Sequence, residues 1–182
     1  MKLIKAKSIS YDTTRKRKYR SIRYIVIHYT GNQGDTAKGN CHYFSPKGGN
    51  TRQAGAHFFV DQQGKYYKSI PMCRTAWSVG GFFTKAGGAG RYYEICTNYN
   101  SVSIEMCDVA SKDPSPEMKK AIKKVIKYIQ RYCPNATTLC RHYDVNGKKC
   151  PGRMCGMKGT KGWERWQALL KYLGYKKGKK IK

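Results

Sequence analysis

Hydrophobic and polar positions alternate with two different periods along this chain, and the periods predict strands and helices in turn. Residues 24–30, YIVIHYT, are β-branched, aromatic and nearly all apolar, which is typical of a strand buried on both faces. The runs SVSIEMCD at 101–108 and ATTLCRHYD from 136 predict two further strands. Residues 55–70 predict a hairpin, because the turn residues DQQG separate two β-rich runs.

A spacing of three to four residues marks the helices. Residues 113–133 are the clearest case, with Asp113 as the expected N-cap and lysines opposite the apolar face. That face consists of Met118, Ile122, Val125, Ile126, Ile129 and Cys133. Residues 161–175 predict a final amphipathic helix, and residues 35–44 a shorter one that begins at Asp35. Strands that alternate with helices indicate an α/β fold with a mixed central β-sheet flanked by α-helices.

A length of 182 residues is typical of one domain. We expect a basic N-terminal arm over residues 1–20, a domain over residues 21–175 and a basic C-terminal tail over residues 176–182. The Gly- and Tyr-rich region 80–100 predicts a long surface loop. No run of 18 apolar residues is present, and the first ten residues lack the apolar core of a secretory signal.

The charge changes this picture, because 37 Lys and Arg face 10 Asp and Glu, a net charge of +27. Such a chain is attracted to polyanions, which include nucleic acids, anionic cell walls and membrane surfaces. A merely solvated, soluble surface is the alternative. No CxxC pair and no nucleic-acid-binding module is found, so no specific nucleic-acid partner is expected. Without a signal sequence, we expect synthesis in a reducing cytoplasm, where most of the eight cysteines stay reduced.

Three residues have the chemistry of zinc ligands. His142 and Cys150 flank a Gly-containing turn, and Zn²⁺ binds neutral imidazole and thiolate. Their spacing of eight requires a loop to bring them together, and a His and a Cys this close are more often unrelated. His28 lies near the end of the first strand, where ligand-bearing residues of sheet folds gather. A core histidine bonded to the backbone is the alternative for that position.

Five separated motifs now indicate a family. YIVIHYTGN, GAHFFVDQQGKYYKSIP, AWSVGG, NSVSIEMCD and RHYDVNGKKCPG follow one another in this order. Together they resemble the zinc-dependent N-acetylmuramoyl-L-alanine amidases, the amidase type 2 family that includes phage endolysins and peptidoglycan recognition proteins. The likeness covers about residues 20–175, and CTNYNSVSIEMC favours the phage or prophage endolysin branch.

The resemblance implies that His28, His142 and Cys150 bind one Zn²⁺ and that water completes the tetrahedron. Cys155 is the alternative fourth ligand, which would close the site. The implied reaction is hydrolysis of the amide between N-acetylmuramic acid and L-alanine. Zinc lowers the pKa of bound water to about 7 and polarises the carbonyl.

The resemblance also implies roles for other residues. Lys148 stabilises the negative charge that develops on the carbonyl oxygen. Many relatives have a proton-shuttling Tyr where this chain has Ala56, so Glu105 is expected to act as general base and acid; a Glu held in a salt bridge is the alternative. His57 lines the cleft or only packs, and Trp77 forms a wall of the cleft.

Thr30 and Asn100 complete the predicted substrate-binding set. Peptidoglycan is the expected partner, with anionic wall polymers such as teichoic acids beside it and an anionic membrane surface as a weaker candidate. We expect a monomer, made in the bacterial host cytoplasm, that acts on the wall after release. A recognition module that binds peptidoglycan without cutting it is the alternative function, and a nucleic-acid-binding zinc protein is the third.

Overall fold

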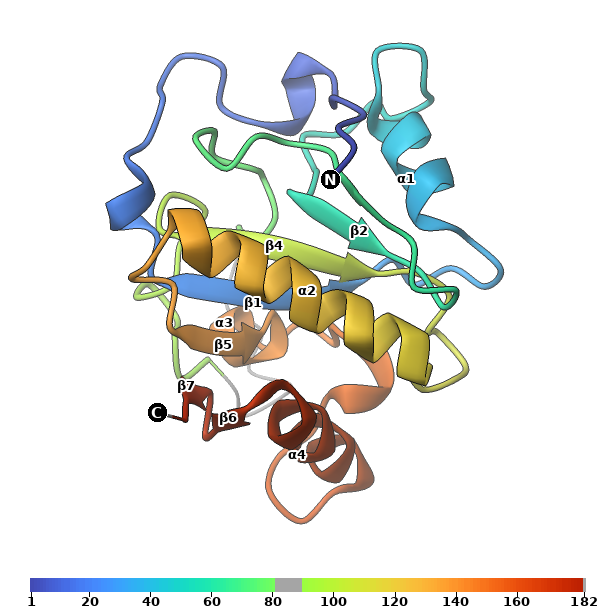
Figure 1. The fold of residues 1–182 in the computed structure, drawn as a ribbon, viewed down its shortest axis with the longest axis vertical. Helices are drawn as coiled ribbons and strands as arrows, with labels where there is room; N and C mark the ends of the chain where they lie inside the picture. The colour runs from blue at the N-terminus through green and yellow to red at the C-terminus, as the bar shows by residue number, and fades with distance from the viewer. Residues whose placement is uncertain (81–89, 182) are drawn as a thin grey trace.

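A mixed β-sheet forms the centre of the protein in this computed structural model, which describes residues 1–80 and 90–181 (Figure 1). Within those residues the sheet has seven strands in the order β3-β2-β4-β1-β5-β7-β6. Their bounds are Tyr24–Tyr29 (β1), Phe58–Val60 (β2), Tyr66–Lys68 (β3), Ser101–Met106 (β4), Thr138–Arg141 (β5), Tyr175–Lys176 (β6) and Lys179–Lys180 (β7). The predicted α/β class, the three main strands and the 55–70 hairpin are confirmed.

The central strand β1 runs parallel to both of its neighbours, β4 and β5. Successive side chains of a strand point to opposite faces of the sheet. Ile25 and Ile27 therefore enter the main core, whereas Val26 and His28 belong to the other face. This alternation decides which residues of β1 contribute to a site and which ones hold the helices.

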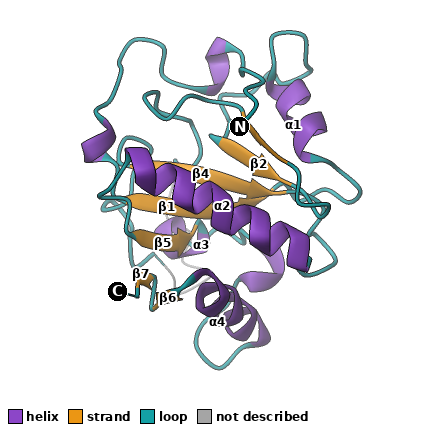
Figure 2. Cartoon of the chain, viewed as in Figure 1, coloured by secondary structure: helices purple, strands orange, loops and turns teal. Residues whose placement is uncertain are grey.

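The helices lie around the sheet, and the longest of them lies across its strands (Figure 2). Their bounds are Ala37–Phe44 (α1), Pro116–Tyr132 (α2), Tyr143–Asn146 (α3) and Lys161–Leu173 (α4), with 3₁₀ turns at Ser8–Ser10, Tyr19–Ser21 and Gly152–Met154. The helices α2 and α4 pack on the main core. All six apolar residues predicted for the inner face of α2 are buried, which confirms that face. No helix in the described part of the chain is long and apolar enough to cross a membrane.

Both expected N-caps are wrong by one or two residues. The hydroxyl of Ser115, not Asp113, accepts the hydrogen bond from the first turn of α2, and that of Thr36, not Asp35, does so in α1. The carboxylate of Asp113 instead pairs with Arg153 and Arg165 at 3.3 and 3.2 Å. The Asp113 carboxylate therefore binds arginines that are distant in sequence, and the nearby hydroxyl of Ser115 caps α2.

The basic N-terminal segment lies along the domain. Ala6, Ser10 and Tyr11 are buried, and so is Arg17, at 4 % exposure. The Arg17 guanidinium donates to the carbonyls of Met72, Asn98, Tyr99 and Ser101. Residues 1–20 thus pack as part of the domain, although their charge predicts an arm; the domain limits 21–175 stay a prediction.

The basic C-terminal residues do not form a simple tail, because β6 and β7 pair with each other and extend the sheet at β5. In the expected loop over residues 80–100, residues 81–89 lie outside the described residues, and residues 91–95 and 98–100 form turns. All eight cysteines are free thiols. Six of them are buried, and Cys73 and Cys155 are half-buried.

Candidate functional site

The candidate site lies at the carboxyl ends of the central parallel strands. In the register of β1 and β4, His28 is paired with Glu105, so both side chains leave the same face of the sheet. His142 directly follows β5, the other neighbour of β1, and donates its backbone N–H to Ile27 at 3.2 Å. Parallel pairing thus brings together residues more than 100 positions apart.

His28, His142 and Cys150 form one compact cluster. One ligand atom from each of the three lies within 4.8 Å of the others. The Sγ of Cys150 is 3.7 Å from Nδ1 of His28, and the two imidazole centroids are 4.7 Å apart. The predicted trio is brought together, and within the described residues Cys155 is not part of the cluster.

The cluster has the properties of a metal centre. Each of the three residues is at most 3 % exposed. Nε2 of His28 and both ring nitrogens of His142 have no hydrogen-bond partner in the described part of the chain. Burial lowers the pKa of His142 to about 4 and that of His28 well below its ordinary value, with Lys148 adding to both shifts. Two neutral imidazoles and a cysteine sulfur are the donors that Zn²⁺ prefers in an open site, so these residues fit that ion.

Glu105 is the acid beside the cluster. Its Oε2 is buried and has no hydrogen-bond partner within the described residues. Burial raises its pKa to about 8, while the positive charge of Lys148 opposes the shift. In the described part of the chain, Glu105 forms no ion pair within 4.0 Å. The alternative role of Glu105, as one partner of a salt bridge, therefore has no support. A carboxyl group with this pKa holds and releases protons near neutral pH.

Two adjoining cavities open beside these residues. One, of about 300 Å³, is lined by all three cluster residues and by Thr30, Trp77 and Lys148. The second, of about 690 Å³, shares Thr30, Glu105 and Lys148 with the first and extends towards α1. Thr30, Trp77 and Lys148 therefore lie where the sequence predicts them. Lys149 also lines the first cavity.

Two predicted substrate-binding residues do not reach these cavities. His57 is 0 % exposed, and its ring is held by Arg17 at 2.8 Å and by Ser103 at 3.0 Å, so it packs behind the site. Asn100 precedes β4, five residues before Glu105, which places it about 16 Å away along the strand. Its side chain instead bonds within the turn, to Thr97 and Ile95.

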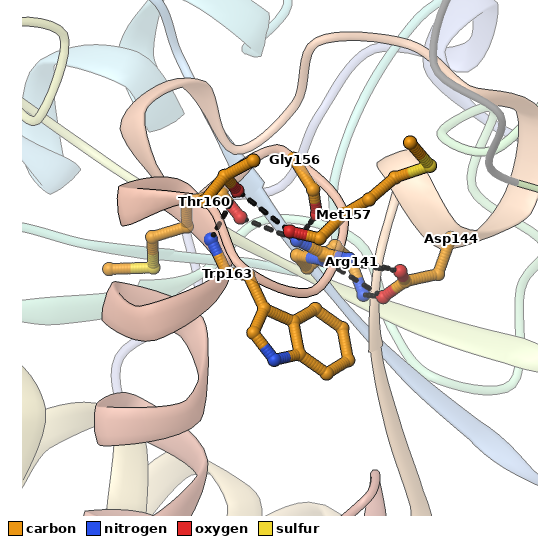
Figure 3. A network of polar contacts seen from close by, with 7 residues as sticks. Arg141, Asp144, Gly156, Met157, Thr160 and Trp163 are labelled. Atoms are coloured by element: carbon orange, nitrogen blue, oxygen red, sulfur yellow. Dashed lines mark hydrogen bonds and ion pairs between the residues drawn. The ribbon is translucent and has the colours of Figure 1, made fainter.

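A buried ion pair holds the segments that carry two of the cluster residues (Figure 3). The Arg141 side chain, only 2 % exposed, contacts Asp144 at 2.6 Å and lies against the rings of Trp163 and Trp166. It also donates to the carbonyls of Met154 at 2.6 Å and Gly156 at 3.1 Å. Arg141 thus ties the strand that ends beside His142 to the loop that follows Cys150. Sequence reasoning missed this role, because nothing in the sequence distinguishes Arg141 from the other Lys and Arg residues, 37 in total.

Sequence reasoning also missed the second cavity's polar lining. Asp35, Asn40 and Arg52 line this cavity. The carboxylate of Asp35 accepts a hydrogen bond from the Asn40 amide at 2.7 Å and another from the backbone of Asp108. Local periodicity places Asn40 on the buried side of a helix but does not indicate a neighbouring cavity.

Comparisons with known proteins agree on one family. A family model described as Amidase_2, N-acetylmuramoyl-L-alanine amidase, matches residues 18–153. The curated N-acetylmuramoyl-L-alanine amidase CwlA of Bacillus subtilis (strain 168) is 30% identical over 135 residues, 72% of this chain and 43% of CwlA. CwlL of Bacillus licheniformis, a protein of the same description, is 29% identical over 139 residues, 74% of this chain and 37% of CwlL. The chain spans about two fifths of the length of these relatives.

Among solved structures, that of PlyL superposes with a TM-score of 0.68 at 22% identity and covers 95% of this chain and 96% of PlyL. This likeness confirms the fold over 95% of the chain.

Proposed function

The chain belongs to the N-acetylmuramoyl-L-alanine amidase family, and from this premise we propose that it hydrolyses the amide between N-acetylmuramic acid and L-alanine in bacterial peptidoglycan as a zinc-dependent phage or prophage endolysin. One observation carries the proposal: three buried side chains able to bind a metal share a cavity with Glu105, whose buried Oε2 has no hydrogen-bond partner in the described part of the chain.

Zinc is the proposed cofactor, held by His28, His142 and Cys150. When bound there, it supplies Lewis-acid activation of a water molecule and of the scissile carbonyl. Nε2 of His28 and both ring nitrogens of His142, which lack hydrogen-bond partners within the described residues, support this assignment, since buried polar atoms normally have partners. Only three protein donors meet in the described part of the chain, which favours an open, catalytic centre over a closed, structural one.

Glu105 is the proposed general base and acid. Its unpartnered Oε2 takes a proton from the attacking water and returns it to the leaving amine of L-alanine. A pKa raised by burial to about 8 supports both halves of this cycle, because the carboxyl group exchanges protons near neutral pH.

Lys148 is the proposed stabiliser of the carbonyl oxygen as it becomes negative. Its side chain lines both cavities, and its charge acts on the pKa values of Glu105 and His142. A fixed positive charge close to the developing oxyanion lowers the energy of the transition state. The Trp77 ring and the buried, unpartnered hydroxyl of Thr30 wall the first cavity, which suits a sugar and a peptide bond.

The proposed partners are peptidoglycan and anionic wall polymers such as teichoic acids, to which a net charge of +27 is attracted. We further propose that the protein is a monomer that is made inside the host and meets the wall after release. A recognition module without catalysis is the second candidate, but an unpartnered buried acid has no evident use in binding alone.

Mass analysis of the products released from purified peptidoglycan tests the proposal. New free N-termini of L-alanine with intact glycan chains are expected, and the Cys150→Ser variant serves as the inactive control. New reducing sugar ends would identify a glycosidase instead. Binding of intact peptidoglycan without any product would identify the recognition module.

A further inference from the structure

The outer face of α2 carries a row of unneutralised positive charges. Five of its exposed residues are basic, and each lies three or four positions from at least one other, so they share one side of the helix. They are Lys120, Lys123, Lys124, Lys127 and Arg131, and we call them the α2 cationic stripe. At 1.5 Å per residue the stripe extends about 16 Å along the helix.

None of the ion pairs found among the described residues involves this stripe. The acidic residue of α2 is Glu117, in the first turn of the helix and before the stripe begins. Within the described residues, the ion pairs use Asp108, Asp113 and Asp144, none of which belongs to α2. The stripe therefore presents a positive potential to solvent that the rest of the protein does not cancel.

Other elements extend the same basic surface. Lys68 of β3 lies over the ring of Tyr128, and Lys180 of β7 donates to the side chain of Gln130 at 3.0 Å. Both contacts fix a lysine next to α2, one on each side of the helix, because β3 and β7 lie in opposite halves of the sheet order. The positive surface is thus broader than one helix.

The stripe costs α2 some of its own stability. Lys120 and Lys124, Lys123 and Lys127, and Lys127 and Arg131 are like-charged pairs four residues apart, and such pairs destabilise a helix. Solubility does not require this arrangement, since the rest of the chain is already strongly basic. A polyanion that contacts the whole row would convert the repulsion into binding energy.

The stripe and the candidate active site belong to opposite faces of the sheet. The inner face of α2 packs on the core that contains Ile25 and Ile27, whereas His28 points to the other side. Figure 1 shows α2 lying across the strands on the near face. A polymer bound to the stripe would therefore leave the two site cavities open.

We propose that the α2 cationic stripe binds a linear polyol-phosphate polymer of the bacterial wall, of the teichoic-acid class. The choice of this polyanion rests on the proposed function, which places the protein at the wall. A membrane fits the stripe less well: the apolar face of α2 is already buried in the core, so the helix has no apolar side to insert into lipid. A row of cations three or four residues apart instead suits regularly spaced phosphates on a flexible chain.

The test compares two variants of the full chain with equal net charge. The stripe variant replaces Lys120, Lys123, Lys124, Lys127 and Arg131 by Gln. The matched control replaces five exposed lysines away from α2 by Gln: Lys5, Lys16, Lys47, Lys158 and Lys161. Each variant lowers the net charge from +27 to +22. Binding to purified poly(glycerol phosphate) is measured by titration calorimetry between 50 and 200 mM salt, with anionic phosphatidylglycerol vesicles and duplex DNA as parallel probes.

The stripe variant should bind poly(glycerol phosphate) at least about tenfold more weakly, with a salt slope reduced by about 3, and the control variant less than about threefold more weakly. Loss of the like-charge pairs should raise the Tm of the stripe variant, although Lys123→Gln also removes the contact of Lys123 with the carbonyl and ring of Tyr172, which offsets part of the gain. Equal losses in both variants would overturn the proposal, because net charge alone would then explain the affinity. The proposal would also be overturned if the stripe variant bound vesicles or DNA more weakly than the wild type but bound the polymer equally well. The membrane or the nucleic acid would then be the partner of the stripe.

Failure of the proposed function is distinguished by a separate measurement. Release of L-alanine N-termini from peptidoglycan stripped of its phosphate polymers should be the same in the wild type and the stripe variant. Absence of this release from the wild type, together with stripe-dependent polymer binding, would refute the amidase and leave the binding surface intact.

Discussion

Replacement of Asp144 by Asn should loosen the two segments that carry His142 and Cys150, two of the proposed zinc ligands. The substitution keeps the shape of the side chain and removes the charge that pairs with Arg141 at 2.6 Å. Arg141 is then a buried cation, 2 % exposed, without a carboxylate. Because its side chain also holds the carbonyls of Met154 and Gly156, any shift of the guanidinium reaches the loop after Cys150.

Breaking a buried ion pair by removal of one partner typically costs about 3–5 kcal/mol. Asp144 is 18% exposed, and Arg141 keeps two carbonyl acceptors and its aromatic neighbours, so we expect the low end, about 3 kcal/mol. For a chain of this length, that loss lowers Tm by about 6–12 °C. Zinc affinity should fall about 10–100-fold, the usual effect of disturbing groups that orient metal ligands.

Urea unfolding with a chelator present measures the free energy of the metal-free protein, and competition with a chromophoric chelator measures zinc affinity separately. Asp113→Asn is the matched control. Like Asp144, Asp113 forms ion pairs with arginine, but it has two such partners and its side chain is 50% exposed. That control should lose less than about 1 kcal/mol. The reasoning fails if the two variants lose equal stability, or if Asp144→Asn leaves zinc affinity unchanged.

Three further substitutions test other parts of the structure. Glu105→Gln should lower kcat about 10²–10⁴-fold and leave zinc affinity as it is; a parallel loss of zinc would show that Glu105 is a ligand instead. Burial and the Arg17 charge hold the pKa of His57 well below its usual range, so the folded state resists protonation and the protein loses stability as pH falls below 6.5. In urea titrations, His57→Gln should therefore lose less stability than the wild type as pH falls from 6.5 to 5, and equal slopes would contradict a neutral His57. Gly162→Ala should destabilise by about 3 kcal/mol in thermal unfolding, despite the better helix propensity of Ala, because the new Cβ would lie 1.7 Å from the Cys155 carbonyl oxygen; an unchanged Tm would contradict this close approach.

The elements with a strong periodic pattern could be predicted from the sequence. The strands β1 and β4 and the helix α2 follow from local composition, since each must bury a defined set of apolar side chains. The N-caps could not be predicted, because Asp113 and Ser115 are both good capping residues. The Asp113 carboxylate pairs with Arg153 and Arg165, which are distant in sequence, and a local sequence pattern does not indicate such contacts.

The N-terminal segment shows the same limit. Its charge favours an exposed arm, yet Arg17 is buried and donates hydrogen bonds to four backbone carbonyls. The ring of His57 lies beside its guanidinium. Those acceptors belong to segments more than 50 residues away. A buried Arg whose acceptors are main-chain groups has no partner that a sequence pattern reveals, so this contact and the packing role of His57 emerge only in three dimensions.

The position of Asn100 could be predicted from the sequence, because strand direction alone decides at which end of the sheet it lies. In a parallel pair, residues that follow both strands meet at one edge, and residues that precede them meet at the opposite edge. His28 is near the end of β1, so only the end of β4, with Glu105, can reach it. The same alternation sends Ile27 and Ile104 towards α2 and His28 and Glu105 away from it. One strand pair therefore places the chemistry on one face and supports the cationic helix on the other, which is why charge on α2 can change without disturbing the site.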